Sequence, residues 1–96
     1  MFAHVNIWQL NEQGHSTDDT AAREIGTQLS QQEGFRSYTV IRTGEGEVVA
    51  ITLFDTRDHL EAGMHSVASF VRSRVDTLVQ GQPQRRAGDV LYHTTA

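Results

Sequence analysis

The sequence contains no cysteine, which excludes disulfide bonds, thiolate metal sites and cysteine nucleophiles together. It also lacks any run that approaches the roughly 18 apolar residues of a membrane-spanning helix. Residues 1–6 (MFAHVN) have neither the basic region nor the long apolar region of a signal peptide. We therefore expect a cytoplasmic protein with no membrane partner.

Positive charge is scarce as well. The chain has 8 Lys and Arg residues against 12 Asp and Glu residues, with a formal net charge of −4. Proteins that bind nucleic acids need clustered Lys and Arg side chains to contact phosphates, and the only adjacent basic pair here is Arg85-Arg86. We expect no nucleic-acid partner.

The length of 96 residues predicts a single domain over residues 1–96, because there is no room for a second core. The hydrophobic content of 38% and the mean hydropathy of −0.43 are those of an ordinary soluble protein. A domain of this size buries only about 60–65% of its unfolded surface. A partner that covers more surface would therefore add to its stability.

Four segments have the alternation, or the β-branched and aromatic content, that is typical of strands. They are residues 2–10 (FAHVNIWQL), 35–42 (FRSYTVIR), 47–54 (EVVAITLF) and 87–95 (AGDVLYHTT). The second and third are joined by a turn signal with two glycines, at residues 43–46 (TGEG).

Two helices are expected between these strands. The first follows a cap at Ser16 or Thr17, and the second runs from Asp55–Asp58 to Val79. Gly26, inside the first helix, costs about 1 kcal/mol relative to Ala, which indicates that another element approaches it closely. The second helix has an apolar stripe of Leu60, Met64, Val67, Val71, Val75 and Leu78.

The element order β-α-β-β-α-β predicts an α+β, ferredoxin-like fold. In this fold an antiparallel sheet carries both helices on one face, with the first strand and the second hairpin strand at its centre. We expect the aliphatic face of the first strand, formed by Ala3, Val5 and Ile7, to pack against the core. Its other face carries Phe2, His4, Asn6 and Trp8.

The central strands carry large apolar side chains on both faces, although helices cover only one. This pattern implies an exposed apolar patch, and such patches mark interfaces. We therefore predict a homodimer in which the two sheets pack face to face.

Two stretches around the predicted hairpin, EGFRSYTV at residues 33–40 and VVAITLFDTR at residues 48–57, resemble the antibiotic-biosynthesis monooxygenase domain family. This family belongs to the dimeric α+β barrel superfamily, and the resemblance covers nearly the whole chain. It implies a cofactor-independent, monooxygenase-like protein that acts on a small aromatic or phenolic compound. Two alternatives stay open: a non-catalytic ligand-binding or stress-responsive dimer, and a small isomerase or lyase that only abstracts a proton.

The resemblance also implies catalytic and substrate-binding residues on the first strand. Family monooxygenases place an Asn there, and sometimes a Trp, which correspond to Asn6 and Trp8. An amide donor can stabilise the oxyanion that forms when a phenolic substrate loses a proton. In the alternative interpretation, Asn6 bonds to a neighbouring backbone group and Trp8 belongs to the dimer core.

Three further residues are weaker candidates. His65, on the flank of the second helix, is a candidate general base because its pKa lies near working pH. Tyr38 and Arg36 share a face of the second strand and are candidates for binding an acidic phenol. Each can equally be an exposed residue without a role.

His4 and His93 lie on terminal strands that we expect to be neighbours.

No metal or cofactor is expected. His59 and His65 lie on different faces of one helix, and no His spacing is typical of a zinc site. The haem-degrading branch of the family needs a Trp in the second helix, where Gly63 stands in this chain. This departure argues against haem degradation.

Overall fold

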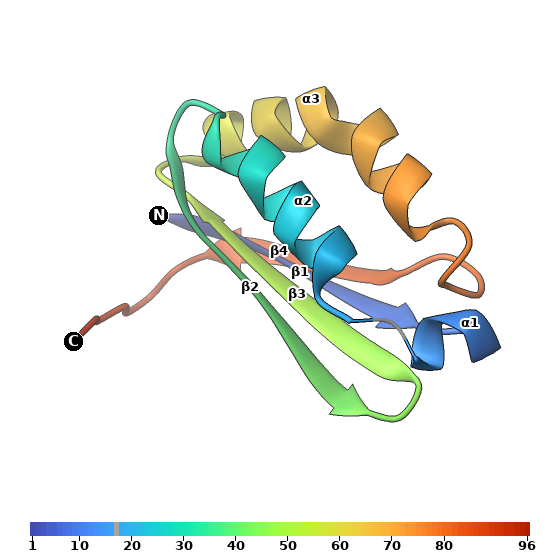
Figure 1. The fold of residues 1–96 in the computed structure, drawn as a ribbon. Helices are drawn as coiled ribbons and strands as arrows, with labels where there is room; N and C mark the ends of the chain where they lie inside the picture. Colours follow the sequence, from blue (N-terminus) through green and yellow to red (C-terminus); the bar gives the residue numbers. More distant parts are fainter. Residues whose placement is uncertain (17) are drawn as a thin grey trace.

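Four antiparallel strands form one sheet, and the helices lie over one of its faces (Figure 1). The structure is a computed structural model that describes residues 1–16 and 18–96. The strands are β1 (Phe2–Gln9), β2 (Phe35–Gly44), β3 (Glu47–Phe54) and β4 (Gln84–Asp89). The helices are α1 (Glu12–His15), α2 (Thr20–Ser30) and α3 (Arg57–Val75).

The strand order across the sheet is β2-β3-β1-β4. This order confirms the predicted ferredoxin-like α+β fold, with β1 and β3 at the centre and α2 and α3 on one face. The only element beyond the prediction is the short helix α1. It begins where the Asn11 side chain accepts a hydrogen bond of 2.9 Å from the Gly14 N–H.

The start of α2 differs from the predicted cap. Asp19 occupies the N-cap position of α2, whereas Ser16 is the C-cap of α1. Thr17, the other predicted cap, lies outside the described residues. The predicted cap at Ser16 was wrong because residues 12–15 form a separate helical turn, α1, and Ser16 ends it.

Helix α3 begins where the sequence predicts. The Thr56 side chain accepts a hydrogen bond of 3.1 Å from the His59 N–H and caps the helix. The helix ends at Val75 rather than at Val79. The chain beyond it is bonded to the end of β1: Val79 forms a bridge with Leu10, and the Gln80 N–H donates to the Gln9 carbonyl at 2.8 Å.

The last strand was predicted over residues 87–95, but β4 covers Gln84–Asp89. The register explains the difference, because Asp89 already pairs with Phe2 at the beginning of β1. Beyond the strand, the Val90 N–H donates to the carbonyl of Met1 at 2.9 Å. The two terminal strands are neighbours as predicted, but His4 pairs with Ala87 and His93 lies beyond the end of β4.

The prediction for the two faces of β1 was also wrong. Its aromatic and polar face, not its aliphatic face, meets the helices, and His4 and Asn6 there are 9% and 7% exposed. The cause lies in β3, whose fully buried Phe54 pairs with Phe2. Paired residues of antiparallel strands share a face, so Phe54 turns this face of β1 toward the core. The core consists of Ile25, Leu29, Phe54, Leu60 and Val67.

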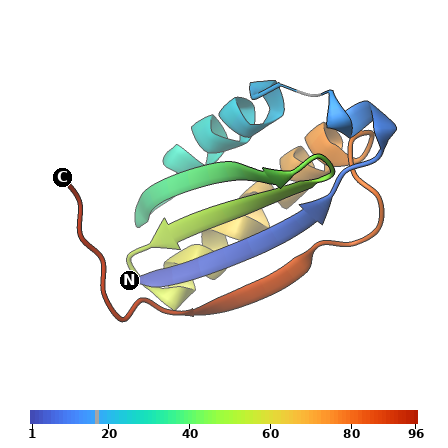
Figure 2. The same cartoon turned by 90° about the horizontal axis from the view of Figure 1, so that it is seen from below.

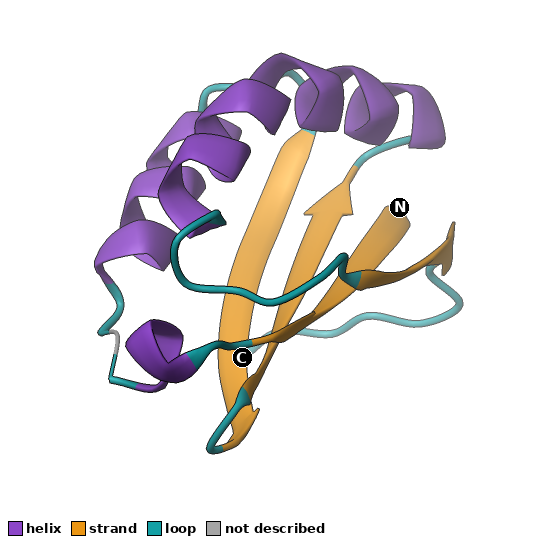
Figure 3. Cartoon of the chain, turned by 90° about the vertical axis from the view of Figure 1, so that its right-hand side faces the viewer, coloured by secondary structure: helices purple, strands orange, loops and turns teal. Residues whose placement is uncertain are grey.

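The opposite face of the sheet has no helix over it in the described part of the chain (Figures 2 and 3). We call this surface the bare face. Ile41, near its edge, is 45% exposed. The apolar residues of the bare face are Ala3, Val5, Ile7, Ile41, Val49, Ile51 and Leu53.

None of the helices in the described residues is long and apolar enough to cross a membrane.

Helix α3 packs closely on β3 at Gly63. A Cβ atom placed on Gly63 would lie 2.6 Å from Cζ of Phe54. We expect Gly63→Val to lower the free energy of unfolding by about 3 kcal/mol, because a buried ring cannot yield to the added atoms. Urea denaturation measures this change. Gly44→Val is the control, since no atom lies within 4 Å of a Cβ there. Equal stability of the two variants would contradict this packing.

Candidate functional site

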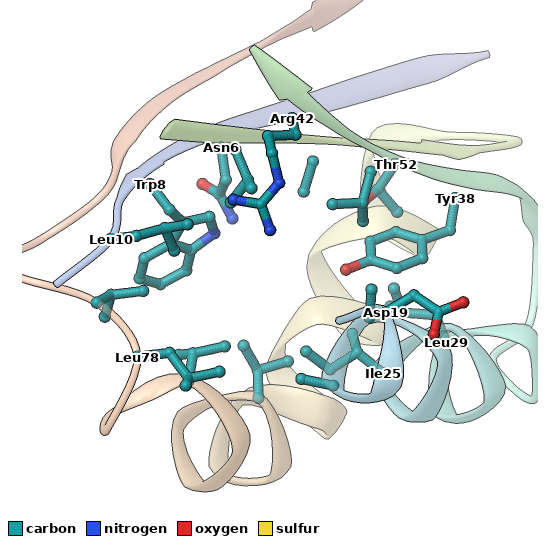
Figure 4. A pocket seen from close by; sticks show the side chains of 18 of the residues that line it. Asn6, Trp8, Leu10, Asp19, Ile25, Leu29, Tyr38, Arg42, Thr52 and Leu78 are labelled. Carbon is teal, nitrogen blue, oxygen red and sulfur yellow. The ribbon is translucent and has the colours of Figure 1, made fainter. Parts of the chain in front are cut away.

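A pocket of about 440 Å³ lies between the sheet and helices α2 and α3 (Figure 4). Its walls are mostly apolar, and a few polar side chains enter it from three neighbouring strands. These are Asn6 and Trp8 from β1, Tyr38 and Arg42 from β2, and Thr52 from β3, and the carboxylates of Asp18 and Asp19 line the pocket at the start of α2. Apolar pockets with few polar groups are typical of sites for small organic ligands. The main apolar residues are Leu10, Ile25, Leu29, Met64, Val71, Val75, Leu78 and Val79.

Asn6 is the most buried polar residue of β1 in this pocket, with 7% of its surface exposed. Its Oδ1 atom has no hydrogen-bond partner among the described residues. A buried carboxamide oxygen without a partner costs about 1–3 kcal/mol, so a group that supplies one would bind favourably.

Tyr38 points its hydroxyl group into the pocket from β2 (Figure 4). Burial raises the pKa of Tyr38 to about 12, so the phenol stays neutral and can donate a hydrogen bond. Its ring packs against α2 at Gly26, where a Cβ atom would lie 3.2 Å from Cδ2 of the ring. The predicted close approach at Gly26 is confirmed, and Tyr38 is the residue that makes it.

Arg42 was missed in the sequence analysis. It lies four residues beyond Tyr38 on the same side of β2, and Figure 4 shows its guanidinium group extending into the pocket. The alternation of the strand could have revealed Arg42, because Tyr38, Val40 and Arg42 all fall on one face.

The structure does not bring Arg36 into this pocket. The register of β2 and β3 shifts between Phe35 and Ser37, which breaks the alternation at Arg36. Its guanidinium instead forms an exposed ion pair with Asp55. The alternation that placed Arg36 beside Tyr38 does not hold across this irregularity.

His65 is also absent from the pocket wall. It is exposed on α3, whereas its neighbour Met64 faces the pocket. Successive residues of a helix are separated by about 100°, which turns the imidazole away from Asn6. Within the described residues, a different histidine, His4, is buried beside Asn6.

The described residues contain no group of three His, Cys, Asp or Glu side chains that could hold a metal ion. Gly63, which the resemblance sets near the Trp of the haem-degrading branch, packs on Phe54. A Cβ atom there would already lie 2.6 Å from Cζ of the ring, so the position has no space for a larger side chain.

Solved structures identify the fold. A "putative antibiotic biosynthesis monooxygenase" from Nitrosomonas europaea superposes with a TM-score of 0.81 at 14% identity, over 96% of this chain and 100% of that one. SnoaB, a cofactor-independent oxygenase from Streptomyces nogalater, gives 0.79 at 12% identity over 96% and 94%. This chain has the fold of antibiotic biosynthesis monooxygenases. Rv0793 from Mycobacterium tuberculosis is similar too, with 0.80 at 18% over 98% of both chains.

The likeness to antibiotic biosynthesis monooxygenases is a likeness of fold. No protein-family model matches the sequence, and no curated protein matches it. Another neighbour from Nitrosomonas europaea, with a TM-score of 0.84 at 10% identity over 99% of this chain and 93% of that one, is a protein of unknown function. Because one fold supports many activities, any function must be argued from the pocket itself.

The environment of Tyr38 can be tested directly. The chain has 2 tyrosines, and Tyr92 is 82% exposed, so Tyr92→Phe leaves Tyr38 as the only phenol without disturbing the core. We expect its phenolate absorbance to appear only as the pH approaches about 12. Ionisation near the ordinary value of 10.0 would show that the hydroxyl is solvated.

Proposed function

We propose that this chain is a homodimeric, cofactor-independent monooxygenase that acts on a small aromatic or phenolic compound. The observation that carries the proposal is the buried carboxamide of Asn6 in the wall of an apolar pocket, because its Oδ1 has no partner among the described residues and can accept a hydrogen bond from a phenol O–H. The pocket suits flat apolar rings, and Asn6 suits an oxygen atom on their edge. The shared fold with an oxygenase that needs no cofactor supports the same reaction class.

An anthrone illustrates the chemistry. Loss of a proton from its ring carbon gives an enolate, whose oxygen carries negative charge and accepts a hydrogen bond from the Asn6 amide group. The enolate carbon then gives electrons to O₂ and bonds to one oxygen atom. That oxygen becomes the second carbonyl of a quinone, and the other leaves as water. The protein contributes by stabilising the oxyanion and by excluding solvent.

The other polar residues have supporting roles in this proposal. The neutral Tyr38 hydroxyl donates to a second oxygen of the substrate, and the positive Arg42 favours a ring that carries phenolate charge. Trp8 offers an aromatic surface on which such a ring can pack. Arg36 and His65, both proposed from the sequence, are given no role because neither lines the pocket.

Asn6→Ala tests the proposal. We expect oxygen uptake with anthrone to fall about 10²–10³-fold, the usual effect of removing one oxyanion donor. An oxygen electrode measures the rate, and a thermal melt shows whether the variant is folded. Ser66→Ala, on the exposed side of α3, is the control.

The outcomes separate the alternatives. Binding of anthrone by the wild-type protein without oxygen uptake would indicate a ligand-binding protein. Proton exchange on a bound substrate without oxygen uptake would indicate an isomerase or lyase. A folded Asn6→Ala variant with full activity would contradict the role of Asn6.

The homodimer in this proposal forms through the bare face. This face presents apolar side chains from three strands and lacks a covering helix within the described residues. Two copies that pack these faces together would bury on the order of 1,500–2,500 Å² in total, and would form a dimeric α+β barrel.

Ile41→Glu should disrupt this dimer. Ile41 is 45% exposed in the single chain, so a charge there leaves the fold intact but becomes buried at the interface, which is costly. We expect light scattering to give twice the chain mass of 10.7 kDa for the wild-type protein and a single chain mass for the variant. Ile41→Val is the matched control. A wild-type monomer at micromolar concentration would refute the interface.

A further inference from the structure

A second, smaller cavity adjoins the main pocket at Asn6. It has a volume of about 240 Å³ and lies between α3 and strands β1 and β4. Asn6 and Trp8 line both cavities, as do Val71 and Val75 of α3. The two spaces are therefore separated by these shared side chains, and Asn6 borders both.

His4 is the residue that distinguishes the smaller cavity. It lies two residues before Asn6 on the same face of β1, so both side chains point toward α3. Only 9% of its surface is exposed, and its Nδ1 atom has no hydrogen-bond partner among the described residues. Buried polar atoms are rarely left unpaired. Here two of them, Nδ1 of His4 and Oδ1 of Asn6, belong to neighbouring residues that line one cavity.

We propose that His4 is the proton acceptor of this site, and that the acidic end of the substrate occupies the smaller cavity while its apolar rings fill the main pocket. This inference rests on the proposed function and deepens it. It predicts an elongated substrate, such as a polycyclic anthrone or phenol, whose ionisable edge reaches beyond Asn6 toward His4.

The proton transfer is simple to balance. A C–H or O–H bond at the acidic end of the substrate breaks, and a new N–H bond forms at Nδ1 of His4. The electron pair stays on the substrate as an enolate or phenolate. The imidazole becomes an imidazolium. It later gives the proton back to the substrate, to the oxygen that leaves as water, or to solvent when the site is emptied. No further reactant takes part in this step.

The surroundings of His4 keep its imidazole neutral. Burial lowers the pKa of His4 below its usual 6.5, and the positive charge of Arg85 on β4 lowers it further, so the ring has an unprotonated nitrogen at pH 7 that can accept a proton. Arg85 is also placed to attract the anion that forms in the same cavity. The other charged groups that line the cavities beside His4 are all on α3 or its end: Arg57, Glu61, Arg72 and Asp76.

Deuterium exchange into anthrone without oxygen isolates the proton transfer from the reaction with O₂. We expect His4→Asn and His4→Gln to slow this exchange at least about 10²-fold. Wild-type exchange should slow as the pH falls through the His4 pKa, below 6.5, because the base becomes protonated. Both variants should lose this acidic limb. His93→Gln, in the exposed tail, is the matched control and should keep it.

The failure of this inference differs from the failure of the proposed function. Trp8 is the only tryptophan and lines both cavities, so its fluorescence reports binding without turnover. If anthrone neither changes the Trp8 fluorescence of the wild-type protein nor exchanges its acidic proton there, both the proposed function and the role of His4 are contradicted. If the wild-type protein turns over anthrone but the folded His4 variants exchange its proton at the wild-type rate, only the role of His4 is overturned. The same holds if the variants exchange more slowly but keep the acidic limb.

A measurement on the wild-type protein covers the case in which both His4 variants fail to fold. Nitrogen NMR of the imidazoles should show one of the five histidines to titrate below the usual pKa of 6.5 and to be strongly perturbed by bound anthrone. Binding that leaves every histidine unchanged would overturn the proposal.

Discussion

The pairing of Phe2 with Phe54 is the constraint on which the site depends. Phe54 is fully buried at the centre of the core, and its ring meets Phe35 edge-on at 5.7 Å. Because β1 and β3 are paired without a shift from Phe2 to Gln9, this one anchor fixes the orientation of every residue along β1. It therefore turns Asn6 toward the helices, and a slip of one residue would present Ile7 in its place.

The same sheet is filled at one end and hollow at the other. Near Phe54 the space under the helices is occupied by aromatic rings and by Leu29 and Leu60. Farther along, Asn6 pairs with Ala50, and α2 contributes small residues to the pocket wall. Short side chains leave the space between the sheet and its helices unfilled. The cavity is thus a direct result of where the large residues stop.

Much of this arrangement could be predicted from the sequence, because it depends on local patterns. The strand order, the Thr56 cap and the close approach at Gly26 all follow from periodicity and residue type. The orientation of β1 could not be predicted, since both of its faces carry apolar residues and only the register with Phe54 decides between them. The same holds for the pocket: Asn6 was proposed from the resemblance, whereas Arg42 and His4 depend on pairing across the sheet.

The segment that follows α3 is held to the end of β1, and it forms part of the pocket wall. The side chain and the backbone N–H of Asn11 donate to the carbonyls of Thr77 and Leu78 at 3.0 and 2.9 Å, and the Gln80 N–H donates to the Gln9 carbonyl. Leu78 and Val79 of this segment line the pocket. A ligand that pushed this part of the wall outward would have to break several hydrogen bonds at once, so the backbone here keeps its place when the pocket is filled.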